Sequence, residues 1–456
     1  MNTDIFREYD IRGIAETDLT PDTVTALSKG YGSLMVRRGH KTVVLGHDLR
    51  LSSPELDRIY LRGLKSTGLH VIRIGQVTTP ALYFAILHYN ADGGVMITGS
   101  HNPIEYNGFK MCEGMGSVYG DDIREILRII QQNDFIESDS GSDEIRELMP
   151  DYIDMLKSKF SFPKSLKVVI DAGNATAGPV APQLWRDLGM DVVELYCEPD
   201  GRFPNHLPDP TVPKYMVDLQ KKVLEENADL GIGYDGDSDR VGAVDNKGRL
   251  IFADTLLALF SRDVLKTKPG SQIIFDVKCS RALPVEIEKY GGVPVMWKTG
   301  HSLLKAKMQE TGAPYAGEMS GHMFFADSFY GFDDGIYASG RLMQILSNTD
   351  KTFADLVDEI PDFPSTPEIR VSCADHAKFH VVQSLAKDFK DNKVIDIDGV
   401  RVEFKDGWGL VRASNTQPTL VLRFEAETQD RLNAIIDLFK KTLKKYPQVE
   451  FDDTDF

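Results

Sequence analysis

Short apolar runs recur in a fixed order along most of the chain. An apolar run that ends at or near an aspartate is followed by a helical stretch, a glycine and a second apolar run, and this order occurs three times. Each unit has the strand–helix–strand order and the length range of a βαβ crossover. The units begin at 43–45, 168–170 and 273–275, with Asp48, Asp171 and Asp276 beside these runs, and end at 71–74, 192–195 and 293–297.

The spacing of these units indicates separate domains. The three aspartates are roughly one hundred residues apart, which is the size of a domain and too long for a solenoid repeat. A single large α/β sheet fits that spacing less well. The pattern therefore predicts an α/β fold of three related domains with mostly parallel, mixed sheets, at residues 1–145, 146–249 and 250–361.

Residues 362–456 break this pattern and predict a fourth, α+β domain. The expected strands are Val400–Phe404, Gly409–Arg412 and Thr419–Glu425. A helix is expected to begin near Gln429. Apolar residues fall on one face of it at helical spacing, namely Leu432, Ile435, Ile436, Phe439 and Leu443. A proline-rich stretch, 361–367, sets this domain off, and an acidic stretch, 137–144, separates the first two domains.

The acidic composition excludes several classes of ligand. The 456 residues include 52 Lys and Arg against 69 Asp and Glu, which gives a formal net charge of −17. Nucleic acids and anionic membranes are bound by basic surfaces, so we expect no nucleic acid and no membrane among the partners. An anionic ligand would need a local basic site within an acidic surface.

The sequence also lacks the patterns of a membrane or secreted protein. No apolar run approaches the roughly 18 residues of a transmembrane helix, and Met1–Asp10 has no apolar core. The four cysteines form no CxxC pair, so they indicate neither a zinc site nor a disulfide framework. We expect a cytoplasmic monomer with reduced cysteines.

The strongest local motif is an acidic loop between two apolar segments. Its three aspartates, at alternate positions, are Asp235, Asp237 and Asp239. Such carboxylates repel one another unless a cation lies among them, and oxygen ligands select a hard ion such as Mg²⁺ or Ca²⁺. An EF-hand needs glycine at its sixth position and glutamate at its twelfth, where this chain has Arg240 and Asn246. A solvated acidic turn is the alternative, and the spacing favours a metal site.

An overlapping segment, Gly231–Gly236, matches the GxGxxG pattern of dinucleotide-binding folds. That pattern binds a pyrophosphate only where a helix begins. Asp237 and Asp239 follow at once and would repel an anion, so a dinucleotide site is excluded.

Thr98–Pro103 places a serine on a glycine turn at the end of an apolar run. Ser100 could there act as an exposed nucleophile. His101 is its neighbour, and since adjacent side chains diverge we expect it to be a poor base for a hydrolase. Lys110 could return a cation to the same site. An ordinary Asn-Pro turn is the alternative for this stretch.

Two further loops gather polar groups that suit a sugar phosphate. Gly317–His322 places a carboxylate, a hydroxyl and an imidazole between glycines, which suits hydrogen bonds to sugar hydroxyls. Arg412–Thr416 offers a guanidinium, two hydroxyls, an amide and the backbone N–H groups of a turn, which suits a phosphate. A capping turn is the alternative for the second loop.

Taken together, these stretches resemble the α-D-phosphohexomutase superfamily, and most closely its bacterial phosphomannomutase/phosphoglucomutase branch. The similarity extends over essentially the whole chain, and Tyr9–Gly13 looks like the N-terminal signature of that family. Four motifs in the family's order are far more specific than any one of them. The resemblance implies three related α/β domains and a distinct fourth around a central cleft, in agreement with the repeat.

The resemblance also implies the roles of individual residues, with Ser100 as the phosphorylated one. The implied catalytic residues are Ser100, Arg12, His101, Lys110, Arg240 and His301. The implied metal ligands are Ser100, Asp235, Asp237 and Asp239. The implied substrate-binding residues are Tyr9, Lys278, His301, Glu318, Met319, Ser320, Gly321, His322, Arg412, Ala413, Ser414, Asn415 and Thr416.

The implied activity interconverts the 1-phosphates and 6-phosphates of mannose and glucose through a phosphoserine and a 1,6-bisphosphate. Phosphorylated hexoses are the implied partners, Mg²⁺ the cofactor and hexose 1,6-bisphosphate the activator. His301 and Lys110 are both candidates for the base that takes the sugar proton. The alternatives are a phosphoglucosamine mutase, a metal-dependent phosphatase and a non-catalytic sugar-phosphate sensor. Met319 argues against the phosphoglucosamine mutase. Ser100 and the three intact aspartates argue against the sensor.

Overall fold

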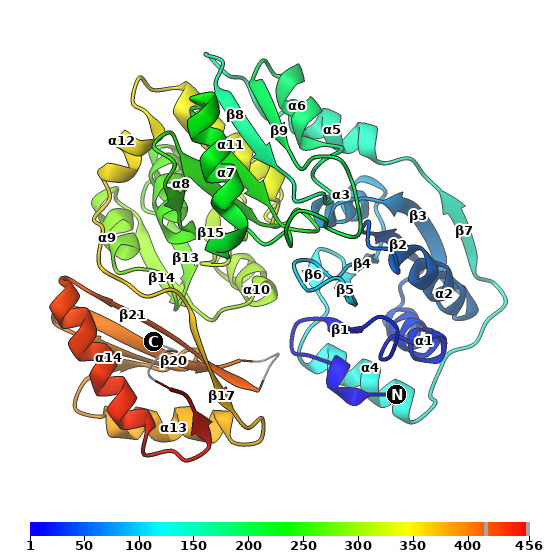
Figure 1. The fold of residues 1–456 in the computed structure, drawn as a ribbon. Coiled ribbons are helices and arrows are strands. Elements are labelled where there is room, and N and C mark those ends of the chain that lie inside the picture. Colours follow the sequence, from blue (N-terminus) through cyan, green and yellow to red (C-terminus); the bar gives the residue numbers. More distant parts are fainter. Residues whose placement is uncertain (415–417, 453–456) are drawn as a thin grey trace.

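The computed structural model describes residues 1–414 and 418–452, and the chain folds into four lobes, each built on its own β-sheet (Figure 1). The lobes follow one another in sequence order, from the blue amino-terminal lobe to the red carboxy-terminal one. The predicted architecture, three α/β domains followed by a different fourth, is confirmed.

The first lobe has a mixed seven-stranded sheet in the order β1-β5-β4-β2-β3-β7, with β6 paired to β5. β2 lies parallel to β3 and β4, as the first predicted unit requires, and β5 joins β4 antiparallel. The strands are β1 (Ile11–Ile14), β2 (Thr42–His47), β3 (His70–Gln76), β4 (Gly93–Ile97), β5 (Tyr106–Glu113), β6 (Gly116–Ser117) and β7 (Ser142–Ile145). The helices are η1 (Thr3–Ile5), α1 (Pro21–Arg37), α2 (Ser53–Ser66), α3 (Thr79–His88) and α4 (Asp121–Gln131).

Helix α3 joins the first lobe to the second. It is apolar on nearly every side, which is typical of a buried helix rather than a surface helix. Leu82 and Phe84 belong to a buried cluster that continues into Tyr152 and Trp185 of the second lobe. Because α3 is held on both sides, its amino-terminal end has a fixed position between the two lobes.

The second lobe has a five-stranded sheet in the order β12-β11-β10-β8-β9. β8 lies parallel to β9 and β10, whereas β10 and β11 form an antiparallel hairpin whose loop is the acidic motif. The strands are β8 (Lys167–Asp171), β9 (Asp191–Leu195), β10 (Leu230–Tyr234), β11 (Val241–Asp245) and β12 (Leu250–Ile251). The helices are α5 (Met149–Lys157), α6 (Ala181–Asp187) and α7 (Pro213–Glu226).

The third lobe has a four-stranded sheet in the order β14-β13-β15-β16. β13 lies parallel to β14 and β15, and β15 and β16 form a hairpin that presents the predicted sugar loop. The strands are β13 (Gln272–Asp276), β14 (Val293–Trp297), β15 (Tyr315–Gly317) and β16 (Met323–Phe325). The helices are α8 (Ala253–Thr267), α9 (Ala282–Lys289), α10 (His301–Thr311), α11 (Gly335–Ser347) and α12 (Phe353–Asp358).

The fourth lobe has an antiparallel six-stranded sheet in the order β18-β19-β20-β21-β17-β22. The strands are β17 (Ile369–Cys373), β18 (Lys393–Ile395), β19 (Val400–Phe404), β20 (Gly407–Ala413), β21 (Thr419–Ala426) and β22 (Val449–Glu450). The helices are α13 (Lys378–Asp388), which has no counterpart in the prediction, and α14 (Gln429–Leu443). The predicted apolar face of α14 packs on β20 and β21. Ile436 is half-buried, and the other residues predicted for that face are buried.

The apolar core unites the first three lobes and leaves the fourth separate. One buried cluster extends from Val44 through Trp185 to Tyr337. The apolar residues of α13, α14 and their sheet form a cluster of their own. A small cluster joins the third and fourth lobes, and its buried members are Val277, Trp408 and Leu410. The fourth lobe is therefore attached to the others through a much smaller apolar contact.

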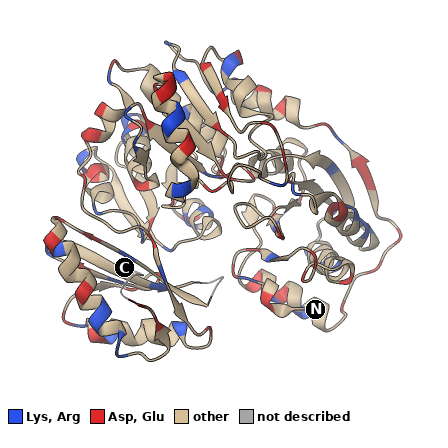
Figure 2. Ribbon diagram, viewed as in Figure 1, with Lys and Arg blue, Asp and Glu red and all other residues tan. Residues whose placement is uncertain are grey.

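Both signs of charge are interspersed over the outer helices, including α7 and α14 (Figure 2). The net charge of −17 is therefore carried by a mixed surface. Among residues 1–414 and 418–452, none of the helices has the length and apolarity needed to cross a bilayer.

Candidate active site

Ser100 stands in the turn after β4, at the carboxyl end of that strand. Its backbone is left-handed, with φ of 47°, a conformation that costs a residue with a Cβ atom on the order of 1–3 kcal/mol. The Ser100 N–H donates to the Thr98 hydroxyl at 2.8 Å. The Ser100 hydroxyl is buried and donates to Asp235 Oδ2 at 2.8 Å. The turn therefore directs Ser100 at the β10–β11 loop of the second lobe.

His101 lies closer to Ser100 than predicted. Its Nδ1 atom is 3.2 Å from Ser100 Oγ. The prediction that these neighbouring side chains diverge is wrong, because the left-handed backbone of Ser100 turns both toward the same side. Burial, together with the positive charges of Arg240 and Arg12, lowers the pKa of His101, so its ring is neutral at pH 7.

The β10–β11 loop, residues 235–240, is called the metal loop below and lies directly against the Ser100 turn. A Cβ atom on Gly236 would lie 2.2 Å from the Ser100 carbonyl oxygen, so glycine is required for this close approach. Thr79, at the start of α3, donates its N–H to the Asp237 carbonyl at 2.9 Å and its hydroxyl to Asp237 Oδ2 at 2.6 Å. The first lobe thus holds the metal loop in two places.

The three aspartates of the metal loop are fully buried, and their oxygens converge. One carboxylate oxygen from each of Asp235, Asp237 and Asp239 lies within 4.8 Å of the others. Lys110 Nζ, on β5, lies 2.6 Å from Asp237 Oδ2 and 2.5 Å from Asp239 Oδ2. Arg240 Nε donates to Asp235 Oδ2 at 3.0 Å. Two cations therefore face three carboxylates.

These contacts determine the charge states of the groups. Burial raises the pKa of Asp235 to about 7, because Arg240 only partly offsets the loss of water and the neighbouring carboxylates oppose ionisation. Burial also opposes ionisation of Asp237, but Lys110 holds the Asp237 pKa below its usual value. The same carboxylates raise the pKa of Lys110 despite its burial, so its ammonium group stays protonated.

The metal loop has the donors that a divalent cation requires. Asp237 Oδ1 and Asp239 Oδ1 are buried and lack a hydrogen-bond partner among the described residues. Leaving carboxylate oxygens unpaired in a protein interior is costly, and a hard cation with oxygen ligands would satisfy them. The residues present therefore fit a metal ion.

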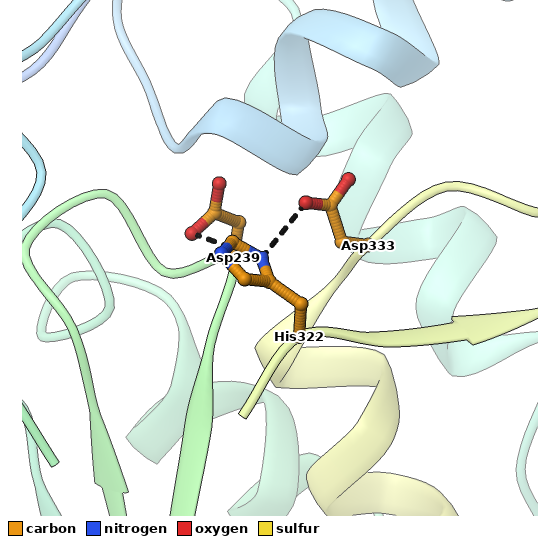
Figure 3. Close-up of side chains that lie close together, drawn as sticks. All are labelled: Asp239, His322 and Asp333. Atoms are coloured by element: carbon orange, nitrogen blue, oxygen red, sulfur yellow. Dashed lines mark ion pairs between the residues drawn. The ribbon is translucent and has the colours of Figure 1, made fainter. Parts of the chain in front are cut away.

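The β15–β16 loop, Gly317–His322, reaches the metal loop through its histidine (Figure 3). His322 Nδ1 lies 2.9 Å from Asp333 Oδ2 and 3.7 Å from Asp239 Oδ1. Burial alone would lower the pKa of His322, but Asp239 and Asp333 raise it. The third lobe thereby contributes an imidazole to the edge of the metal loop.

Asp333 and Lys305 are site residues that the sequence pattern did not reveal. Lys305 Nζ lies 3.4 Å from Asp333 Oδ1, and His301 Nδ1 lies 3.8 Å from Asp333 Oδ2. The rings of His301 and His322 stack, with their centroids 5.3 Å apart. The paired aspartates directly before α11, Asp333 and Asp334, were the signal that could have pointed to this position.

The other residues of the Gly317–His322 loop, called the sugar loop below, bond to one another, to Gly300 after β14 and to Asp276 at the end of β13. Buried Glu318 accepts hydrogen bonds from the Gly300 N–H and, at 3.2 Å, from the Ser320 hydroxyl. Burial raises the pKa of Glu318. The Met319 N–H donates to Asp276 Oδ1 at 3.2 Å. These bonds hold residues 318–320 of the sugar loop, with the Glu318 carboxylate buried among them.

A second set of contacts connects the first, third and fourth lobes. The Tyr9 hydroxyl donates to the Thr299 carbonyl at 3.0 Å. The Thr299 N–H donates to Asp398 Oδ2 at 3.0 Å, and the same oxygen accepts from Arg412 Nε at 3.1 Å. Tyr9, Thr299, Asp398 and Arg412 thus form a chain across three lobes.

Two further predicted cations lie beside these groups. Arg12, on β1, donates to Asp10 Oδ2 at 2.7 Å and to Asn102 Oδ1 at 2.8 Å, next to the Ser100 turn. Lys278 is buried after β13, and its Nζ lies 3.4 Å from Glu368 Oε2. Arg12 therefore lies beside the Ser100 turn, whereas Lys278 lies between the third and fourth lobes.

The predicted phosphate loop is only partly described. Ala413 ends β20, and the Ser414 N–H donates to the Thr419 carbonyl at 3.0 Å. Asn415 and Thr416 lie outside the described residues, so their assignment to a phosphate stays a prediction.

The predicted residues thus gather in two groups. The group around Ser100 comprises Ser100, His101, Lys110, Asp235, Asp237, Asp239, Arg240, His301 and His322, with Arg12 at its edge. The group around Thr299 comprises Tyr9, Lys278, Glu318, Met319, Ser320 and Arg412. Gly300 joins the two groups, because it bonds Glu318 and directly precedes His301.

Four models of one protein family match the chain in order. Their descriptions are phosphoglucomutase/phosphomannomutase alpha/beta/alpha domain I over residues 3–137, domain II over 150–248, domain III over 252–363, and the C-terminal domain over 368–441. The order of these matches follows the order of the four lobes.

Known proteins match over nearly the whole chain. It is 47% identical over 442 residues to the phosphomannomutase/phosphoglucomutase of Pseudomonas aeruginosa, covering 96% of this chain and 95% of that one. It is 44% identical over 451 residues to the phosphoglucomutase of Neisseria gonorrhoeae, covering 98% of both. The crystal structure of a phosphoglucomutase/phosphomannomutase family protein from Burkholderia thailandensis matches with a TM-score of 0.93 at 42% identity, covering 99% of this chain and 100% of that one. The predicted family is confirmed, and the chain belongs to the phosphoglucomutase/phosphomannomutase family.

Proposed function

We propose that this chain is a phosphohexomutase that interconverts the 1-phosphates and 6-phosphates of mannose and glucose. The proposal rests on the contact between Ser100 and the metal loop, where a serine hydroxyl from one lobe meets a buried cluster of three aspartates from another at 2.8 Å. Similarity over the full length to phosphomannomutase/phosphoglucomutase and phosphoglucomutase supports the same activity. Ser100 would carry a phosphoryl group in the resting enzyme.

We assign Mg²⁺ to the metal loop, with Asp235, Asp237, Asp239 and a phosphoserine oxygen as its ligands. When bound, Mg²⁺ would neutralise part of the charge on the transferring phosphoryl group. The chain's own cations act on the same charge, because Lys110 and Arg240 lie against the aspartates and stay protonated.

In the proposed reaction, phosphorylated Ser100 gives its phosphoryl group to the free hydroxyl of the sugar phosphate. The bond between phosphorus and Ser100 Oγ breaks, a bond to the sugar oxygen forms, and the proton of the sugar hydroxyl passes to a base. The hexose 1,6-bisphosphate then turns over in the site and returns its other phosphoryl group to Ser100. Added bisphosphate would act as an activator by restoring enzyme that has lost its phosphate.

Lys110 is a poor candidate for the base, since Asp237 and Asp239 hold its ammonium group and raise its pKa. His301 is buried, and burial lowers its pKa, so its imidazole is neutral at pH 7. Its ring stacks on that of His322, which lies beside the metal loop. The proposal therefore gives proton transfer to His301, keeps His322 as the imidazole paired with Asp333, and leaves Lys110 as an electrostatic group.

Replacing Asp237 with asparagine should raise the Mg²⁺ concentration required for half-maximal activity by about 10–100-fold, the range measured when even an outer partner of a metal site is lost. The substitution keeps the side-chain shape, so the fold should persist while one anionic ligand becomes neutral. Asp245→Asn is the matched control, because Asp245 is equally buried on the same hairpin but bonds to Arg249. Full activity of Asp237→Asn at low Mg²⁺ would refute the metal assignment.

Replacing Arg412 with alanine should raise KM and lower kcat/KM by about tenfold or more, because the variant loses a guanidinium that can donate two hydrogen bonds to one phosphate. Arg431→Ala is the control, since Arg431 pairs with Asp406 at the surface of the same lobe. Thermal unfolding is measured alongside. A large fall in melting temperature for Arg412→Ala with an unchanged KM would show that the pair with Asp398 is structural only.

A coupled assay for glucose 6-phosphate formed from glucose 1-phosphate tests the proposal against its alternatives. The proposed enzyme makes the 6-phosphate and responds to added glucose 1,6-bisphosphate. A phosphatase would release inorganic phosphate instead, and a sensor would do neither. A phosphoglucosamine mutase would prefer glucosamine 1-phosphate to the glucose compound by a wide margin.

A further inference from the structure

Arg50 is a buried arginine that the proposed mechanism does not use. It follows β2, and only 1% of its surface is exposed. Its guanidinium lies inside the Ser100 turn and donates four hydrogen bonds to backbone carbonyls. The acceptors are the carbonyl oxygens of Ser100 at 2.8 Å, Asn102 at 2.6 Å, Pro103 at 2.7 Å and Tyr106 at 3.0 Å.

These four carbonyls belong to one continuous segment, so Arg50 is the centre around which the turn is wrapped. A Cβ atom on Gly99 would lie 2.4 Å from Arg50 Nε, which shows how closely the backbone follows the guanidinium. A guanidinium presents five N–H donors in a rigid plane, whereas an ammonium group presents three from a single point. An arginine side chain can therefore donate to several backbone carbonyls that surround it, whereas a lysine side chain in the same place could not reach all of them.

Arg50 is itself held in place from two directions. Asp48 accepts the Arg50 N–H at 2.9 Å, and its other oxygen accepts the Gly99 N–H at 3.2 Å and lies 3.4 Å from Arg50 Nε. The ring of Phe203, from the second lobe, lies 5.2 Å from the guanidinium carbon. The Arg50 side chain is thus held between the sheet of the first lobe and the Phe203 ring of the second lobe.

The backbone that Arg50 holds is the one that must stay in an unfavourable conformation. Ser100 is left-handed, and such a conformation persists only where the surrounding structure imposes it. A bond to the Ser100 carbonyl fixes one side of the residue, and the bonds to Asn102 and Pro103 fix the segment that follows.

We propose that Arg50 is a positioning residue for phosphoryl transfer, which holds the Ser100 turn so that the serine oxygen stays aligned with the metal loop. The inference rests on the proposed role of Ser100. A misplacement of about 1 Å can lower the rate of an enzyme by about 100-fold, so the position of this turn bears directly on kcat. Substrate groups bound by the third and fourth lobes are not touched by Arg50, so KM should change little.

The test compares Arg50→Lys and Arg50→Met with wild type. Arg341→Lys is the matched control, because Arg341 is also buried and bonded, to Asp263 and Asp327, but away from the turn. Both Arg50 variants should lose about 100-fold in kcat, with KM within about threefold of wild type. Hydrogen exchange of the backbone at 99–106 should be faster in both, and unchanged in Arg341→Lys.

Three results would overturn the inference. Full activity of Arg50→Lys beside an inactive Arg50→Met would show that charge alone is required. A parallel rise in KM and fall in melting temperature, matched by Arg341→Lys, would show a general structural role. If backbone hydrogen exchange at residues 99–106 were unchanged in both Arg50 variants, Arg50 would not stabilise the Ser100 turn. The inference would then be wrong whatever activity the variants showed. Failure of the proposed function is seen separately, as the absence of mutase activity in wild type.

Discussion

Replacing Ser100 with alanine is expected to remove phosphate from the purified protein and to lower mutase kcat by about 10⁴-fold or more, because the group that carries the phosphoryl is gone. The substitution deletes one oxygen, the donor to Asp235, and leaves the Arg50 bonds to the turn in place. The fold should therefore persist. Intact-mass spectrometry before and after the substitution, together with the coupled assay, measures both effects.

Ser261→Ala is the control for this experiment. Ser261 is also buried, on α8, but its hydroxyl donates to the Leu257 carbonyl of its own helix, at 2.7 Å. That variant should keep its phosphate and its activity. A Ser100→Ala protein that still carries one phosphoryl group, or a peptide map that places all phosphate elsewhere, would defeat the assignment of Ser100.

Galactose 1-phosphate should be turned over about 10³–10⁴-fold less efficiently than the glucose and mannose compounds, in the range expected for a site that bonds a particular hydroxyl. Glu318 and Ser320 are proposed to bond the C3 and C4 hydroxyls, which are equatorial in both glucose and mannose. Galactose has an axial C4 hydroxyl, which would leave buried Glu318 poorly paired. Because the buried carboxylate already bonds the Gly300 N–H and the Ser320 hydroxyl, it has little freedom to follow the altered hydroxyl.

The measurement is kcat/KM on the 1-phosphates of glucose, mannose, galactose and N-acetylglucosamine. Glucose and mannose should give similar values, since they differ only at C2. The bulky N-acetyl group at C2 should lower turnover by steric exclusion. Comparable turnover of the galactose compound would contradict the C3/C4 assignment, and a large gap between glucose and mannose would show that C2 is recognised after all.

The repeat of apolar runs predicted the fold well, because each βαβ unit is specified locally. The runs at 43–45, 168–170 and 273–275 became parallel strands, and the end of this repeat after residue 362 predicted a different fourth lobe. Helix α13 was not predicted. It is short, and of its apolar residues only Val381, Val382 and Leu385 are buried.

The site was predictable where chemistry and local spacing coincide, as in the three alternating aspartates. It was not predictable where the partner of a side chain lies far away in the sequence. The link from His322 to Asp333, and the bonds from Arg50 to the Ser100 turn, depend on how the lobes and loops pack together. The position of His101 was mispredicted for a local reason, since the left-handed backbone of Ser100 could not be read from the residue type.

A single-turnover transfer of a phosphorus label shows whether Ser100 passes its phosphoryl group to the sugar. Enzyme labelled with ³²P at Ser100 is mixed with unlabelled glucose 1-phosphate, and the products are separated. We expect the label to leave the protein and to appear in glucose 1,6-bisphosphate and then in glucose 6-phosphate. Label that remains on the protein, or that appears only as inorganic phosphate, would contradict it.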